Sequence, residues 1–210
     1  MDDDDFQPPE PIKGLPEMPP EGEKILWQGK PDWWRLALDA LLVKWVAIYF
    51  ALIAFWQGLA GWLNNDLGIA VASAVWLIGM GVVACAILAA IAWVQAWATV
   101  YTVTNRRIVM RIGAALTMAL NLPYRWIGSA SLQMRGGGTG TIALDLLGST
   151  NFSYLMCWPH VRPWRMRKTQ PALRCIPDAE HVARLIAQNA KAQVTVGVQA
   201  TPDASAIAAE

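Results

Sequence analysis

The chain has 210 residues and a formal net charge of +1 at neutral pH, with 55% hydrophobic and only 16% charged residues. Soluble domains usually carry about 25% charged residues, so a large part of this chain is not expected to face water. A near-neutral chain also lacks the broad basic surface of nucleic-acid-binding domains, and we expect no nucleic-acid partner.

The first segment, residues 1–22, contains four consecutive aspartates and several prolines. Like charges and prolines neither pair nor pack, so we expect a disordered acidic and proline-rich tail. The segment has no basic stretch followed by an apolar core, and a cleavable signal peptide is therefore not expected.

Residues 23–44 are expected to hold a strand and a short helix. Apolar Ile25, Leu26 and Trp27 favour a strand at 24–29 that joins the sheet formed by later residues. In that case the membrane hairpin is an insertion into the domain that contains this sheet. A helix over 33–43 would cover only roughly 16 Å, too short to cross a bilayer, so we expect it to lie at the membrane surface. Its expected apolar face consists of Trp34, Leu38, Leu41 and Leu42, opposite Arg35 and Asp39.

Two long uncharged runs follow, at 45–63 and 69–98. About 20 apolar residues in a helix match the roughly 30 Å hydrocarbon core of a bilayer, so both runs are predicted to be transmembrane helices. The alternative, a buried helical hairpin of a soluble protein, needs a surrounding protein shell that the remaining sequence is too short to supply.

The loop at 64–68 contains no Lys or Arg, whereas Lys44, Arg106 and Arg107 flank the outer ends of the two runs. Basic residues near a span stay on the cytoplasmic side. We therefore predict that both termini are cytoplasmic and that residues 64–68 form a periplasmic loop.

The second run contains small residues four positions apart, Gly81, Cys85 and Ala89. Small residues let helices approach closely inside a membrane. They are candidates for helix packing, either against the first run of the same hairpin or against a partner.

Beyond residue 98, hydrophobic residues alternate with polar ones, as in strands with one buried face. The alternating sets include Ile108, Met110 and Ile112, and then Ile142, Leu144 and Leu146. A last strand near 171–176 is followed by Pro177, by Asp178 as a helix cap, and by a helix to about Lys191. Residues 99–193 are thus expected to be a cytoplasmic antiparallel domain closed by a C-terminal helix, and 194–210 a flexible tail.

Two sets of segments carry a resemblance. GEKILWQGKP before the hairpin and YTVTNRRIVMR after it resemble the bacterial pleckstrin-homology-like (PH-like) membrane proteins. LPEMPPEGEKILWQGKPDWW, VAIYFAL, NLPYRWIGSASL and TQPALRCIPDAEHVARLIAQ resemble the photosynthetic-complex assembly proteins of purple bacteria. The first resemblance implies an α+β membrane protein, with a transmembrane hairpin and a PH-like antiparallel sheet closed by an α-helix.

The second resemblance implies a membrane-anchored assembly factor in the bacterial inner (intracytoplasmic) membrane. Its implied partners are reaction-centre subunits and light-harvesting subunits, with self-association into a homodimer. An alternative from another class is an anionic-lipid-binding PH-like protein that organises membranes.

The sequence offers no recognisable catalytic chemistry. Gly136–Gly140 lacks the following Lys of a phosphate-binding loop, and no serine lies in a nucleophile elbow. A zinc site is conceivable, but the cysteines and histidines lack the usual ligand spacing. Its four possible ligands are Cys157, His160, Cys175 and His181. We therefore expect no enzyme activity, no metal and no cofactor.

The most distinctive polar segment interleaves cations with an aromatic residue near position 165. Close to an anionic leaflet, each cation contributes about 1 kcal/mol of attraction. This segment is predicted to bind lipid or a partner, although a solvated loop that only obeys the positive-inside bias is an equal alternative. The candidate residues are Arg162, Trp164, Arg165, Arg167 and Lys168, together with Arg106 and Arg107.

Overall fold

The computed structural model describes residues 14–15, 18–114, 117–148 and 152–199. The chain divides into two compact units. Residues 32–97 form one unit, and the segments before and after them form the other. We describe each unit by itself.

The first sheet of the larger unit is antiparallel, with strand order β1-β2-β3-β4. Its strands are β1 (Ile25–Gly29), β2 (Val100–Thr104), β3 (Arg107–Ile112) and β4 (Met118–Pro123). The strand expected at 24–29 is present as β1 and pairs with β2, so that Gly29 lies opposite Tyr101. The whole apolar hairpin is therefore inserted between two neighbouring strands of one sheet.

The second sheet is also antiparallel, with order β5-β6-β7. It contains β5 (Ile127–Met134), β6 (Thr139–Leu146) and β7 (Ala172–Pro177). Short helical turns precede or interrupt these strands, namely η1 (Tyr124–Trp126), η2 (Gly136–Gly138) and α4 (Tyr154–Cys157). The chain then ends its described part in α5 (Ala179–Gln199).

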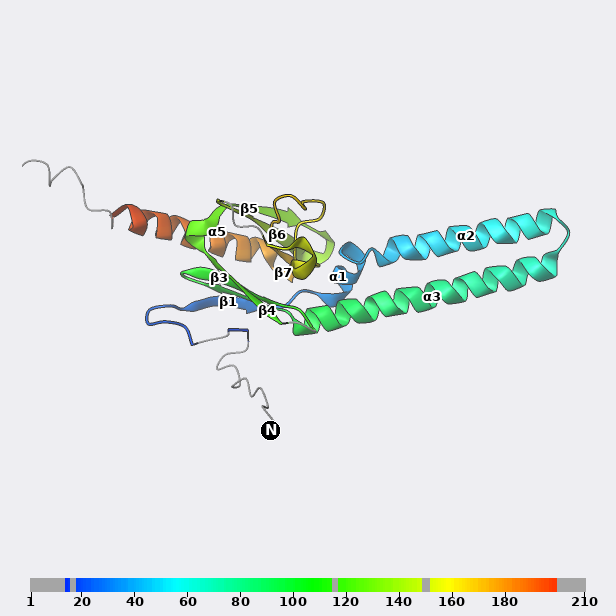
Figure 1. Cartoon of the computed structure of the whole chain (residues 1–210), viewed down its shortest axis with the longest axis horizontal. Coiled ribbons are helices and arrows are strands. Elements are labelled where there is room, and N and C mark those ends of the chain that lie inside the picture. The colour runs from blue at the N-terminus through cyan, green and yellow to red at the C-terminus, as the bar shows by residue number, and fades with distance from the viewer. Residues whose placement is uncertain (1–13, 16–17, 115–116, 149–151, 200–210) are drawn as a thin grey trace, which may run out of the picture. The chain divides into compact units, whose positions relative to one another are not determined.

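The core of this unit lies between the two sheets and α5. The alternating residues of β3 and β6 are buried, as their spacing predicts. Helix α5 contacts β5, β6 and η1 and adds Ala179, Val182 and Ile186 to the core. Figure 1 shows α5 beside β5, β6 and β7. Because each fully buried aliphatic side chain contributes about 1.5–3 kcal/mol, this amphipathic face is what holds the helix on the sheets.

Helix α5 is longer than the sequence predicts. It runs to Gln199, whereas we expected it to end near Lys191 and a flexible tail to begin at 194. No proline follows until Pro202, and the single Gly197 costs only about 1 kcal/mol in a helix. Gln193 also donates a hydrogen bond from Nε2 to the carbonyl of Asn105 at 3.0 Å, which ties this part of the helix to the β2–β3 turn. Residues 200–210 lie outside the described residues.

The expected disorder of residues 1–22 is wrong for the part that the structure describes. Leu15 is only 1% exposed. Gly14 has a φ of +95°, and a Cβ there would lie 2.6 Å from Val100 Cγ1, so a side chain at this position would clash. Gly22 is held by a 3.0 Å hydrogen bond from Asn105 Nδ2 to its carbonyl. Residues 1–13, 16 and 17 lie outside the described residues.

In the smaller unit the short helix is α1 (Trp33–Asp39), which is capped by Asp32 and separated from the next helix by a turn at Leu42 with a φ of +55°. None of the four residues expected to form its apolar face is buried against protein, as a face that meets lipid requires. Leu36 and Ala37 are the buried residues, and Trp34 is exposed. Ala37 clusters with Val43 and Ala92, so a second face of the helix, which the sequence did not predict, packs against the base of the hairpin.

Two long helices complete this unit, α2 (Val43–Leu63) and α3 (Leu67–Ala98). Figure 1 shows them running antiparallel and joined by a short turn. The second helix begins two residues before the expected Ile69, where Asp66 Oδ1 accepts a hydrogen bond from Ile69 N at 3.4 Å in the manner of an N-cap. By length and composition both helices are able to cross a membrane, and only 6% of the most apolar window of each is buried. The described chain thus does not supply the protein shell that a buried soluble hairpin requires.

Candidate functional site

The predicted cationic segment is a loop that leaves and rejoins the sheet at one point. We call residues 162–170 the cationic loop. Val161 forms a bridge with Pro171 at its base, and Arg162 N donates to the Gln170 carbonyl at 2.9 Å. Ala172 N then donates to the His160 carbonyl at 2.9 Å, where β7 begins. The loop is therefore anchored at its base by backbone hydrogen bonds.

The tip of the cationic loop presents apolar and cationic side chains to solvent. Trp164 is 87% exposed, and Met166 is 65% exposed. Arg165 and Arg167 are exposed beside them. Trp164 also has a φ of +64°, a left-handed conformation that non-glycine residues seldom adopt. An exposed Trp flanked by arginines suits an anionic interface, where the ring is amphipathic and the charges are attracted.

Lys168 and Arg162 differ from the residues of the tip. Lys168 Nζ forms a half-exposed salt bridge with Asp145 Oδ1 at 3.0 Å. Its hydrogen bond holds the pKa of Asp145 below the ordinary value. Arg162 is half-buried, and its Nη1 donates to Gln170 Oε1 at 3.2 Å. The structure thus separates the five predicted loop residues into an exposed tip and two residues that hold the base.

Arg106 and Arg107 lie at the turn between β2 and β3. Arg107 Nε donates to Glu23 Oε1 at 2.8 Å, and the Glu23 side chain is almost fully buried. Burial acts to raise the pKa of Glu23, but hydrogen bonds from Arg107 and Thr104 outweigh it and hold the pKa below its ordinary value. Arg107 therefore joins the segment before β1 to the sheet.

A pocket of about 250 Å³ opens next to the cationic loop. Three arginines line it, Arg135 from the β5–β6 turn, Arg162 from the loop and Arg174 from β7. The other lining residues are Ser131, Leu132, Gln133, Thr141, Ala143 and Pro163. Of the three arginines, the sequence singled out Arg162 alone. The missed signal was Arg174, a lone cation within the otherwise apolar strand ALRCIP.

A buried polar cluster lies beside Arg174. Arg174 N donates to Tyr101 Oη at 3.4 Å, and Tyr101 Oη lies 2.6 Å from His160 Nδ1. Since the tyrosine oxygen already accepts one hydrogen bond, we assign its O–H as the donor to Nδ1, which leaves Nε2–H to donate to Thr99 Oγ1 at 3.0 Å. Burial, and then the charge of Arg174, lower the pKa of His160 from 6.5 to about 3. His160 is therefore neutral at pH 7.

The four possible zinc ligands lie in different settings. Both ring nitrogens of His160 are occupied by hydrogen bonds, and His181 is exposed on α5. Cys157 is buried in α4, and burial raises the pKa of its thiol. Within the described ranges, no three such side chains gather in a metal-binding arrangement.

The predicted small-residue stripe of α3 includes two contacts with α2 of the same hairpin. A Cβ on Gly81 would lie 2.8 Å from Phe50 Cβ, so glycine is required for this close approach. Cys85 Sγ lies 3.9 Å from the Val43 carbonyl, and Ala89 is half-buried. Of the two alternatives for this stripe, these contacts favour packing within the hairpin.

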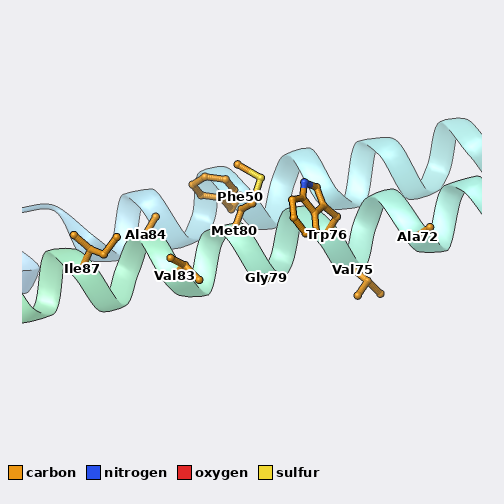
Figure 2. Close-up of a pocket in the computed structure, with 9 residues that line it drawn as sticks. All are labelled: Phe50, Ala72, Val75, Trp76, Gly79, Met80, Val83, Ala84 and Ile87. Atoms are coloured by element: carbon orange, nitrogen blue, oxygen red, sulfur yellow. The ribbon is translucent and has the colours of Figure 1, made fainter.

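A different face of α3 carries an open apolar groove of about 690 Å³, which we call the hairpin groove. Figure 2 shows Phe50 of α2 beside Met80 and Trp76 of α3. A Cβ on Gly79 would meet nothing within 4 Å. The remaining lining residues are Ala72, Val75, Val83, Ala84 and Ile87. The sequence signal was the recurrence of lining residues every three or four positions along α3, which marks one helix face.

Comparison with known proteins identifies the family. The bacterial PH domain profile matches residues 40–190. The chain belongs to the bacterial PH domain family. The chain is 42% identical over 209 residues to a 23.7 kDa protein in the puhA 5′ region of Rhodobacter capsulatus, covering 98% of this chain and 97% of that protein. No solved structure matches this chain. The family match confirms the PH-like fold that the sequence implied.

Proposed function

We propose that this chain is a membrane-anchored assembly factor for the photosynthetic reaction centre and its light-harvesting complex, of the type called PuhB in purple bacteria. The observation that carries the proposal is the end-to-end relative whose gene lies in the 5′ region of the reaction-centre gene puhA. Identity of 42% over 98% of the chain makes a shared architecture and a related role the simplest reading.

The anchor in this proposal is the α2–α3 hairpin. At about 1.5 Å per residue, a helix the length of α2 spans the roughly 30 Å hydrocarbon core, and α3 is longer than the core requires. Their exposed apolar side chains are satisfied by lipid in the bacterial inner (intracytoplasmic) membrane. The basic flanks and a connection at 64–68 that has no Lys or Arg support cytoplasmic termini and a periplasmic connection.

In mechanism, the hairpin groove docks a transmembrane helix of a reaction-centre or light-harvesting subunit. Gly79 and Ala72 allow the partner backbone to approach closely, and Trp76 and Met80 provide contact area. The PH domain, joined to both roots of the hairpin through β1 and β2, holds a soluble segment of the same subunit at the cationic loop. Binding of this kind needs no covalent chemistry, and the chain acts as a scaffold and not as an enzyme.

A second candidate function is favoured by the exposed tip of the cationic loop. Trp164, Arg165 and Arg167 form a compact apolar and cationic surface. Attraction of about 1 kcal/mol per cation to an anionic leaflet would let the PH domain organise lipids independently of photosynthesis.

The test is deletion of the gene combined with affinity purification of the tagged full chain from gently solubilised membranes. We expect deletion to lower reaction-centre abundance while pigment synthesis continues, and reaction-centre or light-harvesting subunits to co-purify. Equal loss of free pigment would point to a biosynthetic role. Recovery of anionic lipid without any of these subunits would favour the second candidate.

A further inference from the structure

The pocket beside the cationic loop is built on the outer face of the second sheet. Along β6, Ile142 and Leu144 face the core, while Thr141 and Ala143 face the opposite side. Opposite them on β5, Ser131 pairs with Ala143 and Gln133 pairs with Thr141. The floor of the pocket is therefore a regular pair of strands. We call the site the arginine pocket.

Arg174 lines this pocket from β7, beside a bulge in that strand. Gly140 pairs with Ile176 and Ile142 pairs with Leu173, so Thr141 faces two residues, Arg174 and Cys175. Cys175 has a φ of +52°, and its N–H donates to Thr141 Oγ1 at 3.5 Å. Bulges re-aim side chains, and left-handed conformations in non-glycine residues cluster at ligand sites. Leu173 pairs with core residue Ile142 and Ala172 pairs with Ala143, so alternation along β7 puts Arg174 on the same outer face as Ala143, and the bulge follows it.

The charges in the arginine pocket are all of one sign. Arg174 is only 5% exposed, and its Nη1 donates to the Pro159 carbonyl at 3.2 Å. Arg162 is oriented by Gln170, and Arg135 lies at the end of β5. Among the described residues that line the pocket there is no Asp or Glu. The field of Arg174 also reaches His160, where it helps to keep the imidazole neutral.

We propose that the arginine pocket binds a phosphate group. Guanidinium groups bind phosphate through paired, charge-assisted hydrogen bonds, and several of them suit a group that carries more than one negative charge. The Ser131 and Thr141 hydroxyls and the Gln133 amide provide further hydrogen-bonding groups around the pocket.

The size of the pocket limits the ligand. About 250 Å³ is below the range of roughly 300–1,000 Å³ that accommodates drug-sized molecules. The pocket therefore accommodates a phosphate group with a small substituent, and the rest of a larger ligand would project out of its mouth. Two sources share this chemistry, a soluble phosphate ester and the headgroup of an anionic phospholipid. The site goes beyond the proposed assembly role and does not depend on it.

The experiment measures phosphate binding by the full chain in two settings. Inorganic phosphate is titrated into detergent-solubilised protein by calorimetry. In parallel, the protein is reconstituted into nanodiscs of phosphatidylcholine alone or with phosphatidylglycerol, and solvent protection of β5 and β6 is followed by hydrogen exchange. The test variant is R135Q/R162Q. Its matched control is R125Q/R184Q, which removes the same charge from exposed arginines outside both the pocket lining and the cationic loop.

We expect saturable phosphate binding that R135Q/R162Q weakens by at least tenfold, on the order of one charge-assisted hydrogen bond, and that R125Q/R184Q leaves within twofold. Protection that requires phosphatidylglycerol and is lost in the test variant would assign the source to lipid. Equal weakening by both variants would show that general electrostatics suffices and would overturn the proposal. Absence of both saturable phosphate binding and lipid-dependent protection in the unmodified chain would also overturn it.

Discussion

His160 accepts a 2.6 Å hydrogen bond from Tyr101, and this buried pair joins β2 to the segment that leads into the cationic loop. Burial raises the pKa of Tyr101, so the phenol keeps its proton and remains a donor at physiological pH. The imidazole, with its pKa lowered to about 3, stays neutral and remains the acceptor. The two shifts have opposite signs and preserve the same hydrogen bond.

The free energy of unfolding should therefore fall as the pH drops below 6.5, the ordinary pKa of a histidine. Below pH 6.5 the unfolded chain takes up a proton that folded His160 refuses until about pH 3, so the free energy of unfolding decreases through this window. At about 1.4 kcal/mol per pH unit, the loss between pH 6.5 and 5 is about 2 kcal/mol. Thermal unfolding of the full chain in detergent, followed by circular dichroism, measures it.

The control for this prediction is H160Q, which keeps hydrogen-bonding capacity but does not titrate. We expect its melting temperature to change much less between pH 6.5 and 5. This range lies above the window in which Glu23 and Asp145, whose pKa values are lowered, lose their contribution. Identical pH profiles for the two proteins would contradict the assignment of a neutral buried imidazole.

The ion pair between Glu23 and Arg107 should stabilise the junction between the N-terminal segment and the sheet. E23Q leaves Arg107 without its carboxylate in a largely buried setting, which should cost about 1–3 kcal/mol. The lower melting temperature of E23Q should be compared with E21Q, which removes the same charge from a neighbouring exposed residue. A decrease of the same size in both would mean that net charge, and not the ion pair, sets stability.

A bulky side chain in the hairpin groove should reduce subunit capture. A Cβ on Gly79 or on Gly58 would meet nothing within 4 Å, but only Gly79 lines the groove, so G79L and G58L form a matched pair. Overpacking a close contact costs about 1–3 kcal/mol, so G79L should recover about tenfold less of the reaction-centre or light-harvesting subunits. Quantitative mass spectrometry of the purified complexes measures this. Unimpaired recovery with G79L would place the docking surface elsewhere.

The exposed tip of the cationic loop should contribute to anionic-lipid contact. R165Q/R167Q removes two cations that each contribute about 1 kcal/mol, so less phosphatidylglycerol should co-purify with the full chain. R125Q/R184Q removes the same charge from exposed arginines outside the loop and should change the lipid content little. If both double variants co-purify with as much phosphatidylglycerol as the unmodified chain, the loop is a solvated surface that does not bind lipid.

Much of the fold followed from local patterns. Ile108, Met110 and Ile112 alternate along β3 and are all buried, because the period of a strand puts them on one face. The two uncharged runs correspond to α2 and α3, because their length and apolar composition are typical of helices that can cross a membrane. The local pattern was insufficient where a residue distant in sequence determines which side chains are buried. In α1, Ala37 is buried because it packs against Ala92.

The candidate site was only partly predictable. The cationic loop is contiguous in sequence, and its composition drew attention to it. The arginine pocket combines Arg135, Arg162 and Arg174 from three separate segments, which only the pairing of β5, β6 and β7 brings together. No spacing rule connects these residues. The hairpin groove was missed because only Gly81, Cys85 and Ala89 were considered as small residues of α3, whereas Gly79 lines the groove.

The insertion of the hairpin between β1 and β2 has a consequence for biosynthesis. The ribosome makes β1 first, and the strand has no neighbour until the two long helices and β2 have been made. Closure of the first sheet therefore requires that the whole insert has been synthesised. A truncated or mis-threaded insert would leave an unpaired strand edge at the N-terminus, which quality-control proteases can recognise.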